Sequence, residues 1–205
     1  MVVSHMVRHL LLGAVAPPLV WLAASLFPQP KGLSRRTALG TLLTHPLTSW
    51  LAATSTVIAW HVPAAFNLAQ RSTLWHGLQD ASFLATGLLF WWPVVRPWPA
   101  AERLSGPAIA LYLFAATLPC DVLSAFLVFC DRGVYRQPPA THHVGAAALA
   151  DQQTAGALMW VSVTFIYLIP ALVLIVRALS PQYTEPTRDP QSWSDSGHSV
   201  PRKDI

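Results

Sequence analysis

The chain has 205 residues, of which 53% are hydrophobic and only 11% are charged. Soluble domains carry about 25% charged residues, so this composition excludes an ordinary soluble domain and indicates a membrane protein. The formal net charge of +4 comes from Lys and Arg residues scattered singly between apolar runs, which argues against a nucleic-acid-binding protein.

Five apolar runs are each long enough to cross a membrane as a helix. They cover roughly residues 2–27, 46–67, 73–95, 106–130 and 151–179. The first run is too long for a signal peptide, and its Pro17-Pro18 pair predicts a kinked helix. The sequence therefore predicts an all-α, polytopic transmembrane helical bundle of about five spans.

Several local signals predict where these helices begin and end. Thr44 is a plausible N-cap with Pro46 in the first turn, and Pro63 should break or kink the second helix. Pro93, after Trp91-Trp92, should stop the third. Beyond Ser180 the chain is rich in Pro, Ser and charged residues. We expect residues 1–179 to form the bundle and residues 180–205 to be a disordered cytoplasmic tail.

The distribution of Lys and Arg predicts the orientation of the bundle. With five spans, nine basic residues fall on one side and four on the other, and the positive-inside rule makes the richer side cytoplasmic. The richer side has Lys31, Arg35, Arg36, Arg96, Arg103, Arg177, Arg188, Arg202 and Lys203; the other has Arg8, Arg71, Arg132 and Arg136. The N-terminus is then outside and the C-terminus cytoplasmic.

This orientation gathers polar side chains at the outer ends of the helices. On the third helix, His76 and Asp80 stand one above the other, and Phe83 and Gly87 continue the stripe. The other outer residues are His5 and His9 of the first helix, His61 of the second, Asp151, Gln152 and Gln153 of the fifth, and His142-His143 of an outer loop. Ionisable residues within spans are costly and usually face the bundle interior.

Imidazoles from three helices at one membrane depth, with thioether and carboxylate groups in reserve, suit copper better than magnesium or calcium. Met159 shares a helix face with Gln152, and Gly156 lies between them at close-packing spacing. Taken singly, each histidine is more readily explained as an interhelical hydrogen-bonding group, and Met6 and Met159 as packing residues.

Cys120 and Cys130 are the two cysteines, and they give neither a disulfide framework nor a CxxC motif. Ten residues apart on one helix, they would lie about 15 Å from each other and could not bridge. We interpret them as thiols packed among helices. Asp121, in the middle of the fourth span, could serve either an interhelical bond or an ion path.

Four segments in this order resemble the membrane-integral CtaG-type cytochrome c oxidase assembly family. They are SHMVRHLLLGAVAPPL, WHVPAAFNLA, WHGLQDASFLATGLLFWWPVV and DQQTAGALMW, and the resemblance covers roughly residues 4–175. The FWWP and DQQ-AG-LMW segments are the most specific. Family members usually show His-x-x-Glu-His in the third span, where this chain has His76, Gln79 and Asp80. They are also usually longer, with six or seven helices, so we expect a preceding helix to be missing.

The resemblance implies a multi-pass protein of the bacterial inner membrane that helps to mature a haem-copper oxidase by handling copper. Our leading hypothesis is therefore an assembly factor and not an enzyme, with an oxidase subunit as the expected partner and a periplasmic copper chaperone as a further candidate. By motif matching, His5, His9, His61, His76 and Asp151 carry over as functional positions. With Asp80 and Met159 added from the residue pattern, these seven are the expected copper ligands.

Two other functions use the same residues. A haem- or quinone-binding redox protein could ligate haem through histidines of two helices, for example His9 and His76. A metal-free scaffold could clamp an oxidase subunit and use the histidines as interhelical hydrogen-bonding groups. A proton or solute transporter is less favoured, because Asp121 alone marks a path through the bilayer centre.

We expect the purified protein to bind copper near stoichiometrically and to lose it when His5→Ala and His9→Ala are combined. Because imidazoles bind metal only when neutral, copper binding should weaken below about pH 6.5. Metal analysis and an absorption spectrum check both expectations. An unchanged copper content in the double variant would remove the first helix from the site.

Overall fold

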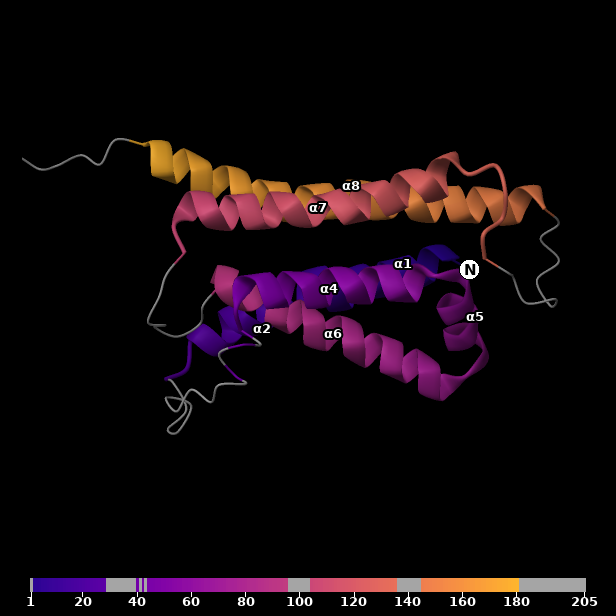
Figure 1. Ribbon diagram of the computed structural model, residues 1–205, viewed down its shortest axis with the longest axis horizontal. Coiled ribbons are helices and arrows are strands. Elements are labelled where there is room, and N and C mark those ends of the chain that lie inside the picture. Colours follow the sequence, from indigo (N-terminus) through magenta and orange to yellow (C-terminus); the bar gives the residue numbers. More distant parts are fainter. Residues whose placement is uncertain are drawn as a thin grey trace, which may run out of the picture.

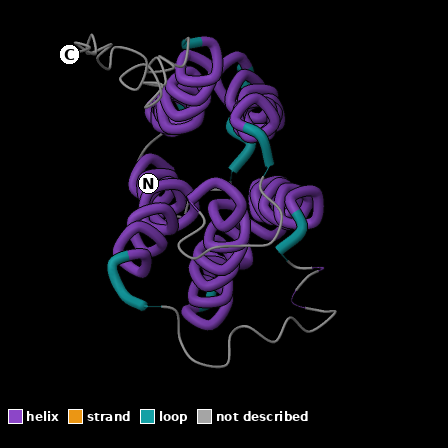
Figure 2. The backbone as a smooth tube through the Cα atoms, turned by 90° about the vertical axis from the view of Figure 1, so that its left-hand side faces the viewer, coloured by secondary structure: helices purple, strands orange, loops and turns teal. Residues whose placement is uncertain are grey.

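Helices are the only regular elements in the part of the chain that the computed structural model describes, which comprises residues 2–28, 40, 42, 44–95, 104–135 and 145–180 (Figures 1 and 2). The all-α prediction is therefore confirmed. The expected tail beyond Ser180 and the loop with His142-His143 lie outside the described residues.

The first helix is continuous from Val2 to Ser25 but changes its winding in the middle. It consists of α1 (Val2–Leu10), the π-helical segment η1 (Leu11–Val15) and α2 (Ala16–Ser25). The Ala16 N–H donates to the Leu11 carbonyl, five residues back. Pro17 and Pro18 have no N–H to give to the preceding turn, so the wider π turn accommodates the proline pair there.

The second apolar run forms two helices, α4 (Pro46–His61) and α5 (Pro63–Arg71). Val62, with φ −61° and ψ 129°, separates them, as expected for a residue before proline. The break predicted at Pro63 is confirmed. The predicted N-cap is wrong, because the His45 side chain, and not Thr44, accepts from the Leu47 N–H. The Thr44 hydroxyl donates instead to the Gly40 carbonyl.

The third apolar run forms α6 (Thr73–Val95), with the predicted bounds. Pro93 lies inside this helix and does not stop it. A proline in the last turn of a helix removes one hydrogen bond, and the helix can continue for a few residues beyond it.

The last two described helices are α7 (Gly106–Phe129) and α8 (Ala146–Leu179). The α8 helix begins several residues earlier than predicted, so Asp151 lies within it and does not open it. These two helices pack closely, because Gly156 of α8 has no side chain to hold α7 away. A Cβ atom there would lie 3.0 Å from the Leu127 Cβ atom and 3.2 Å from the Ser124 carbonyl oxygen.

The helices form two groups, which the first helix joins. The α7 and α8 helices pack against each other, whereas α6 packs against α4, α5 and α2. Figure 1 shows the α7–α8 pair on one side and α4 and α6 on the other, with α1 behind α4 on the same side as α4 and α6. The α1 helix packs on α8 while η1 and α2 pack on α6, so the first helix links the two groups, and α4, which packs on both α6 and α7, links them as well.

The first helix and α6 run parallel and approach closely at two glycines. A Cβ atom on Gly87 would lie 2.6 Å from the Gly13 carbonyl oxygen and 2.8 Å from the Pro17 side chain. One turn earlier on each helix, the rings of His9 and Phe83 stack with centroids 4.1 Å apart. The glycine contact therefore sets the register of the two helices that carry most of the polar residues.

Three helices in the described residues are long and apolar enough to cross a membrane: Val2–Ser25, Gly106–Phe129 and Ala146–Leu179. This identifies a membrane protein. The α4 helix has only 16 residues, and α6 carries His76, Gln79 and Asp80 near one end. The count of five spans and the orientation stay predictions.

Replacement of Gly87 by Ala should destabilise the bundle by about 1–3 kcal/mol, because the new methyl group would meet a backbone oxygen that cannot move aside. Gly77→Ala is the matched control on the same helix, since a Cβ atom there meets nothing within 4 Å. Thermal unfolding in detergent would measure both variants. Equal melting temperatures for G87A and the wild type would contradict the close packing.

Candidate functional site

The polar residues predicted to gather at one end of the bundle do lie together. His5, His9 and His61 are buried, with 5%, 6% and 6% of their surfaces exposed. Ring centroids are 4.0 Å apart for His5 and His9, and 6.4 Å apart for His9 and His61. His76 lies 5.7 Å from His5 by the same measure. Imidazoles from α1, α4 and α6 thus meet at one depth, as predicted.

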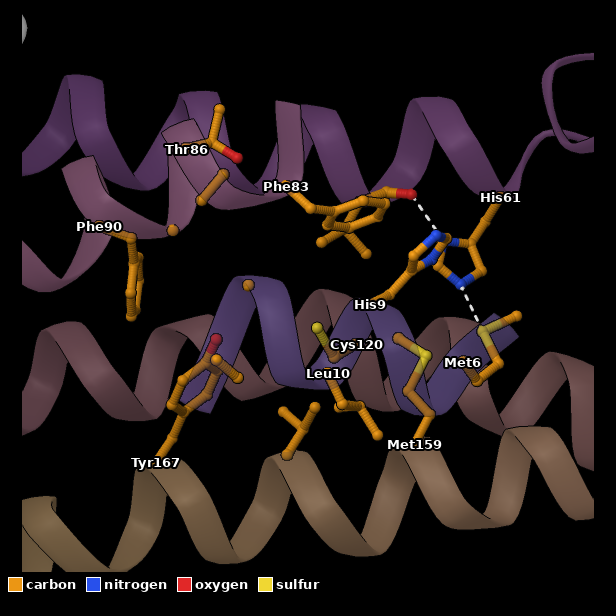
Figure 3. Close-up of a pocket in the computed structure, with 16 residues that line it drawn as sticks. Met6, His9, Leu10, His61, Phe83, Thr86, Phe90, Cys120, Met159 and Tyr167 are labelled. Atoms are coloured by element: carbon orange, nitrogen blue, oxygen red, sulfur yellow. Dashed lines mark hydrogen bonds between the residues drawn. The ribbon is translucent and has the colours of Figure 1, made fainter. Parts of the chain in front are cut away.

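Two interactions fix the orientation of the His61 ring. Its Nδ1 atom lies 2.7 Å from the Val57 carbonyl oxygen, which can only accept a proton, so Nδ1 is the donor. Its Nε2 atom lies 3.4 Å from the Met6 sulfur (Figure 3). In a neutral imidazole with its proton on Nδ1, Nε2 presents a lone pair. Two electron-pair donors from α4 and α1 therefore face each other.

The other two buried imidazoles have polar atoms without partners among the described residues. Both ring nitrogens of His9 and the Nε2 atom of His5 make no hydrogen bond there. His5 Nδ1 contacts the Gln70 side-chain nitrogen at 3.1 Å. Buried polar groups are normally paired, so unpaired nitrogens gathered in one place indicate room for a ligand.

His76 and Asp80 are engaged by a cation of the protein itself. Arg8 Nη1 donates to His76 Nε2 at 2.8 Å, and Arg8 Nε lies 3.2 Å from an Asp80 carboxylate oxygen. The His76 and Asp80 side chains lie 3.9 Å apart. The Arg8 guanidinium thus occupies the position between imidazole and carboxylate where we expected a metal. A metal ligated by this pair would have to displace Arg8.

Asp151 and Gln152 make structural contacts at the same end. The Asp151 carboxylate accepts from the Val2 N–H at 2.6 Å, which ties α8 to the start of α1. The side-chain amide oxygen of Gln152 accepts from the Val134 N–H at 2.7 Å. The side-chain amide nitrogen of Gln152 donates to the backbone carbonyls of Leu127 and Arg132 at 3.4 and 3.3 Å. Gln152 thereby closes the C-terminal end of α7 and holds the segment after it.

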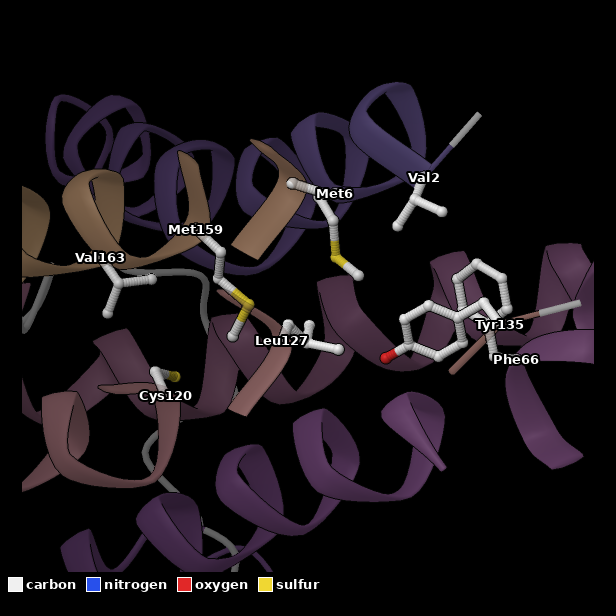
Figure 4. Packing of buried hydrophobic residues seen from close by; sticks show 9 residues of the cluster. Val2, Met6, Phe66, Cys120, Leu127, Tyr135, Met159 and Val163 are labelled. Atoms are coloured by element: carbon white, nitrogen blue, oxygen red, sulfur yellow. The ribbon is translucent and has the colours of Figure 1, made fainter. Parts of the chain in front are cut away.

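Sulfur atoms line a cavity that extends from His61 toward the middle of the bundle. It has a volume of about 60 Å³, and Met6, His9, His61, Cys120 and Met159 are among the residues that line it (Figure 3). Met6 and Met159 are 1% and 5% exposed, and both belong to the buried cluster shown in Figure 4. Cys120 and Cys130 are free thiols, in agreement with the prediction that they do not bridge. Asp121 does not line the cavity.

Within the described ranges, no three side chains of His, Cys, Asp or Glu converge on one metal position. His61 Nε2 and the Met6 sulfur, 3.4 Å apart, are two candidate soft ligands in direct contact. Metal ligation by the seven predicted residues therefore stays a prediction. Five of the seven already have partners in the protein: His5 contacts Gln70, His61 contacts Val57, His76 and Asp80 contact Arg8, and Asp151 contacts Val2.

A model of the cytochrome c oxidase caa3 assembly factor family matches residues 1–180. The chain belongs to this family. No curated protein and no solved structure matches the chain. Membership of the caa3 assembly factor family indicates a role in cytochrome c oxidase assembly with oxidase-related partners, and the resemblance in the sequence is confirmed.

In this member of the caa3 assembly factor family, the sequence did not reveal the roles of Arg8, Gln79 and Tyr135. Gln79, and not Asp80, is the residue of α6 that points inward, because Gln79, Phe83 and Gly87 form its buried face. Spacing of three and four residues permits either stripe, so only packing decides between them. The Tyr135 hydroxyl donates to the His61 carbonyl at 3.3 Å, a long-range contact that no local pattern signals.

Replacement of Gln152 by Ala should destabilise this assembly factor by about 1–3 kcal/mol, since the Val134 N–H and two carbonyls lose their partner. It should also increase proteolysis in the segment after Phe129. Gln153→Ala, one residue along the same helix, is the control and should behave like the wild type. Similar cleavage rates in the two variants would contradict the role assigned to Gln152.

Proposed function

We propose that this protein assists the maturation of a haem-copper cytochrome c oxidase by binding copper between its histidine and methionine side chains and passing it on. It would act as an assembly factor with no catalysed reaction of its own. Copper is the cargo in this proposal, and an oxidase subunit is the recipient. A periplasmic copper chaperone is the donor that the location of the site favours.

The observation that carries the proposal is the contact between His61 Nε2 and the Met6 sulfur at 3.4 Å. The bond from Nδ1 to the Val57 carbonyl leaves Nε2 without a proton in the neutral ring, so nothing bridges these two electron-pair donors. Ligands at about 2.0–2.3 Å from one ion lie within about 4.6 Å of each other. One soft cation between them would turn an unfavourable contact into a favourable one, and imidazole with thioether suits copper.

The neighbouring groups support the same proposal. The unpaired nitrogens of His9 lie beside His61, and Met159 lines the same cavity. These groups provide further neutral ligands from α1 and α8 without a change of fold. Copper held by His61 and Met6 could thus complete its ligand set from the cavity side.

The size of the cavity favours a metal ion over the haem or quinone alternative. Its volume is about 60 Å³, whereas pockets for organic ligands measure about 300–1,000 Å³. A haem between His9 and His76 would also have to displace Arg8 from His76. The alternative of a metal-free scaffold requires no cavity. Metal analysis distinguishes it from the copper function, because a scaffold would contain no copper.

We further propose that the protein crosses the bacterial inner membrane five times, with α4 and α6 as the additional spans. The bias of Lys and Arg then places the histidine cluster at the periplasmic face and the C-terminus in the cytoplasm. A periplasmic location would put the cluster where copper arrives from outside the cell.

His61→Asn should reduce the copper content of the purified protein from near one ion per chain toward background, because asparagine cannot place a nitrogen lone pair against the Met6 sulfur. His45→Asn is the matched control: His45 is the N-cap at the far end of α4, and asparagine is itself a good N-cap. Elemental analysis after desalting measures both variants.

Copper retained by H61N at the level of H45N would remove the His61–Met6 pair from the site. If the wild type itself holds no copper but still captures oxidase subunits, the scaffold function replaces the copper function. An absorption band of haem in the wild type would instead support the redox alternative.

A further inference from the structure

The cavity beside His61 is lined by neutral groups only, among the residues that the structure describes. Its polar lining consists mainly of imidazoles, two thioethers and a thiol, with no Asp, Glu, Lys or Arg. A cation placed there would find ligands but no opposite charge. Its own charge therefore decides how much its transfer from water costs.

Two carboxylates at this end of the bundle already have partners in the protein. Asp80 pairs with the Arg8 guanidinium at 3.2 Å, and Asp151 accepts from the Val2 N–H at 2.6 Å. The second oxygen of Asp80 makes no hydrogen bond within the described part of the chain, but Arg8 still balances the charge of this group. The charge of Asp80 is therefore balanced by Arg8, and Asp151 is not among the residues that line the cavity.

Gln79 is the residue of α6 that adjoins this cluster from the inside. It is 0% exposed, and neither its amide nitrogen nor its amide oxygen has a hydrogen-bond partner among the described residues. It lies beside the His9 ring, within reach of a weak hydrogen bond to it, so the amide and the ring compensate each other only in part. A fully buried amide with unused hydrogen-bonding groups is costly, and its presence here favours a site that a ligand completes.

We infer that the lining without charged groups, together with the uncharged Gln79 beside His9, makes the site selective for a soft monovalent cation, Cu⁺, over divalent ions such as Cu²⁺ and Zn²⁺. The free energy of transferring an ion from water into a medium of low dielectric constant rises with the square of its charge. This desolvation free energy is therefore about four times as large for a divalent ion as for a monovalent one. Thioether ligands favour the same choice, because they bind Cu⁺ better than harder ions. The inference rests on the proposed copper function and adds the oxidation state of the copper.

Gln79→Glu tests the inference, since it adds one negative charge at nearly constant volume. Attraction to that charge is twice as large for a divalent ion, so the preference for Cu⁺ over Zn²⁺ should fall at least tenfold. Gln153→Glu makes the same change on α8, at a residue that does not adjoin His9 as Gln79 does, and should leave the preference unchanged. Both affinities of the full-length protein in detergent can be measured by competition. A Cu⁺ chelator is used under anaerobic conditions, and a Zn²⁺ chelator is used for the zinc affinity.

A measurement on the wild type keeps the inference testable if Q79E does not fold. Protein loaded with Cu⁺ should hold about one copper without a paramagnetic resonance signal, whereas protein offered Cu²⁺ without reductant should take up little. Tight binding of Cu²⁺ or Zn²⁺ by the wild type, or an unchanged preference in folded Q79E, would overturn the selectivity but leave copper binding intact. Failure to bind copper in either oxidation state would overturn the proposed function, and the selectivity with it.

Discussion

The close contact between Gly13 and Gly87 is the constraint on which the rest of the structure depends. Pro17 lacks the N–H that would occupy the Gly13 carbonyl, and the π turn accommodates this local change. Because α6 can approach only where it has no side chain, the contact fixes the register of two parallel helices. His9 then meets Phe83 one turn earlier, and Gln79 follows one turn beyond that, beside the cluster. A backbone contact in the middle of the bundle thus positions the polar groups at its end.

Much of this arrangement could be predicted from the sequence, because hydrophobic run length and proline placement are local signals. They located α6, the break before Pro63 and the common end at which His5, His9 and His61 lie. Periodicity could not decide which stripe of α6 faces inward, since residues three and four apart share a face. The sequence pattern indicated Asp80 as the polar residue of α6 that faces inward, whereas packing of the helices buries Gln79. Arg8 was missed for a related reason: its position between His76 and Asp80 depends on contacts between helices far apart in the chain.

Arg8 divides the polar end of the bundle into two environments. On its side, a guanidinium, a carboxylate and an imidazole form a charged network, and 56% of the Arg8 side chain is exposed. On the inner side, His5, His9, His61 and Met6 are buried and neutral ligands predominate. The charged side chains and the neutral nitrogen and sulfur side chains are thereby separated by only a few ångströms. The same helix, α1, supplies residues to both environments, because Arg8 and His9 are adjacent in sequence and point in different directions.

The length of α8 has a consequence for how deep the Met159 sulfur lies. This helix has 34 residues and is about 51 Å long, whereas the hydrocarbon layer of a membrane measures about 30 Å. Asp151 and Arg177 are separated by about 39 Å along it, so the two charges can rest in opposite headgroup layers. Neither can be drawn inward without cost, which prevents the helix from sliding along the membrane normal. Met159 lies about 12 Å below Asp151, beneath the headgroups. Under the proposed copper function, transfer of copper to a partner protein would therefore take place across a docked protein surface and not through bulk solvent.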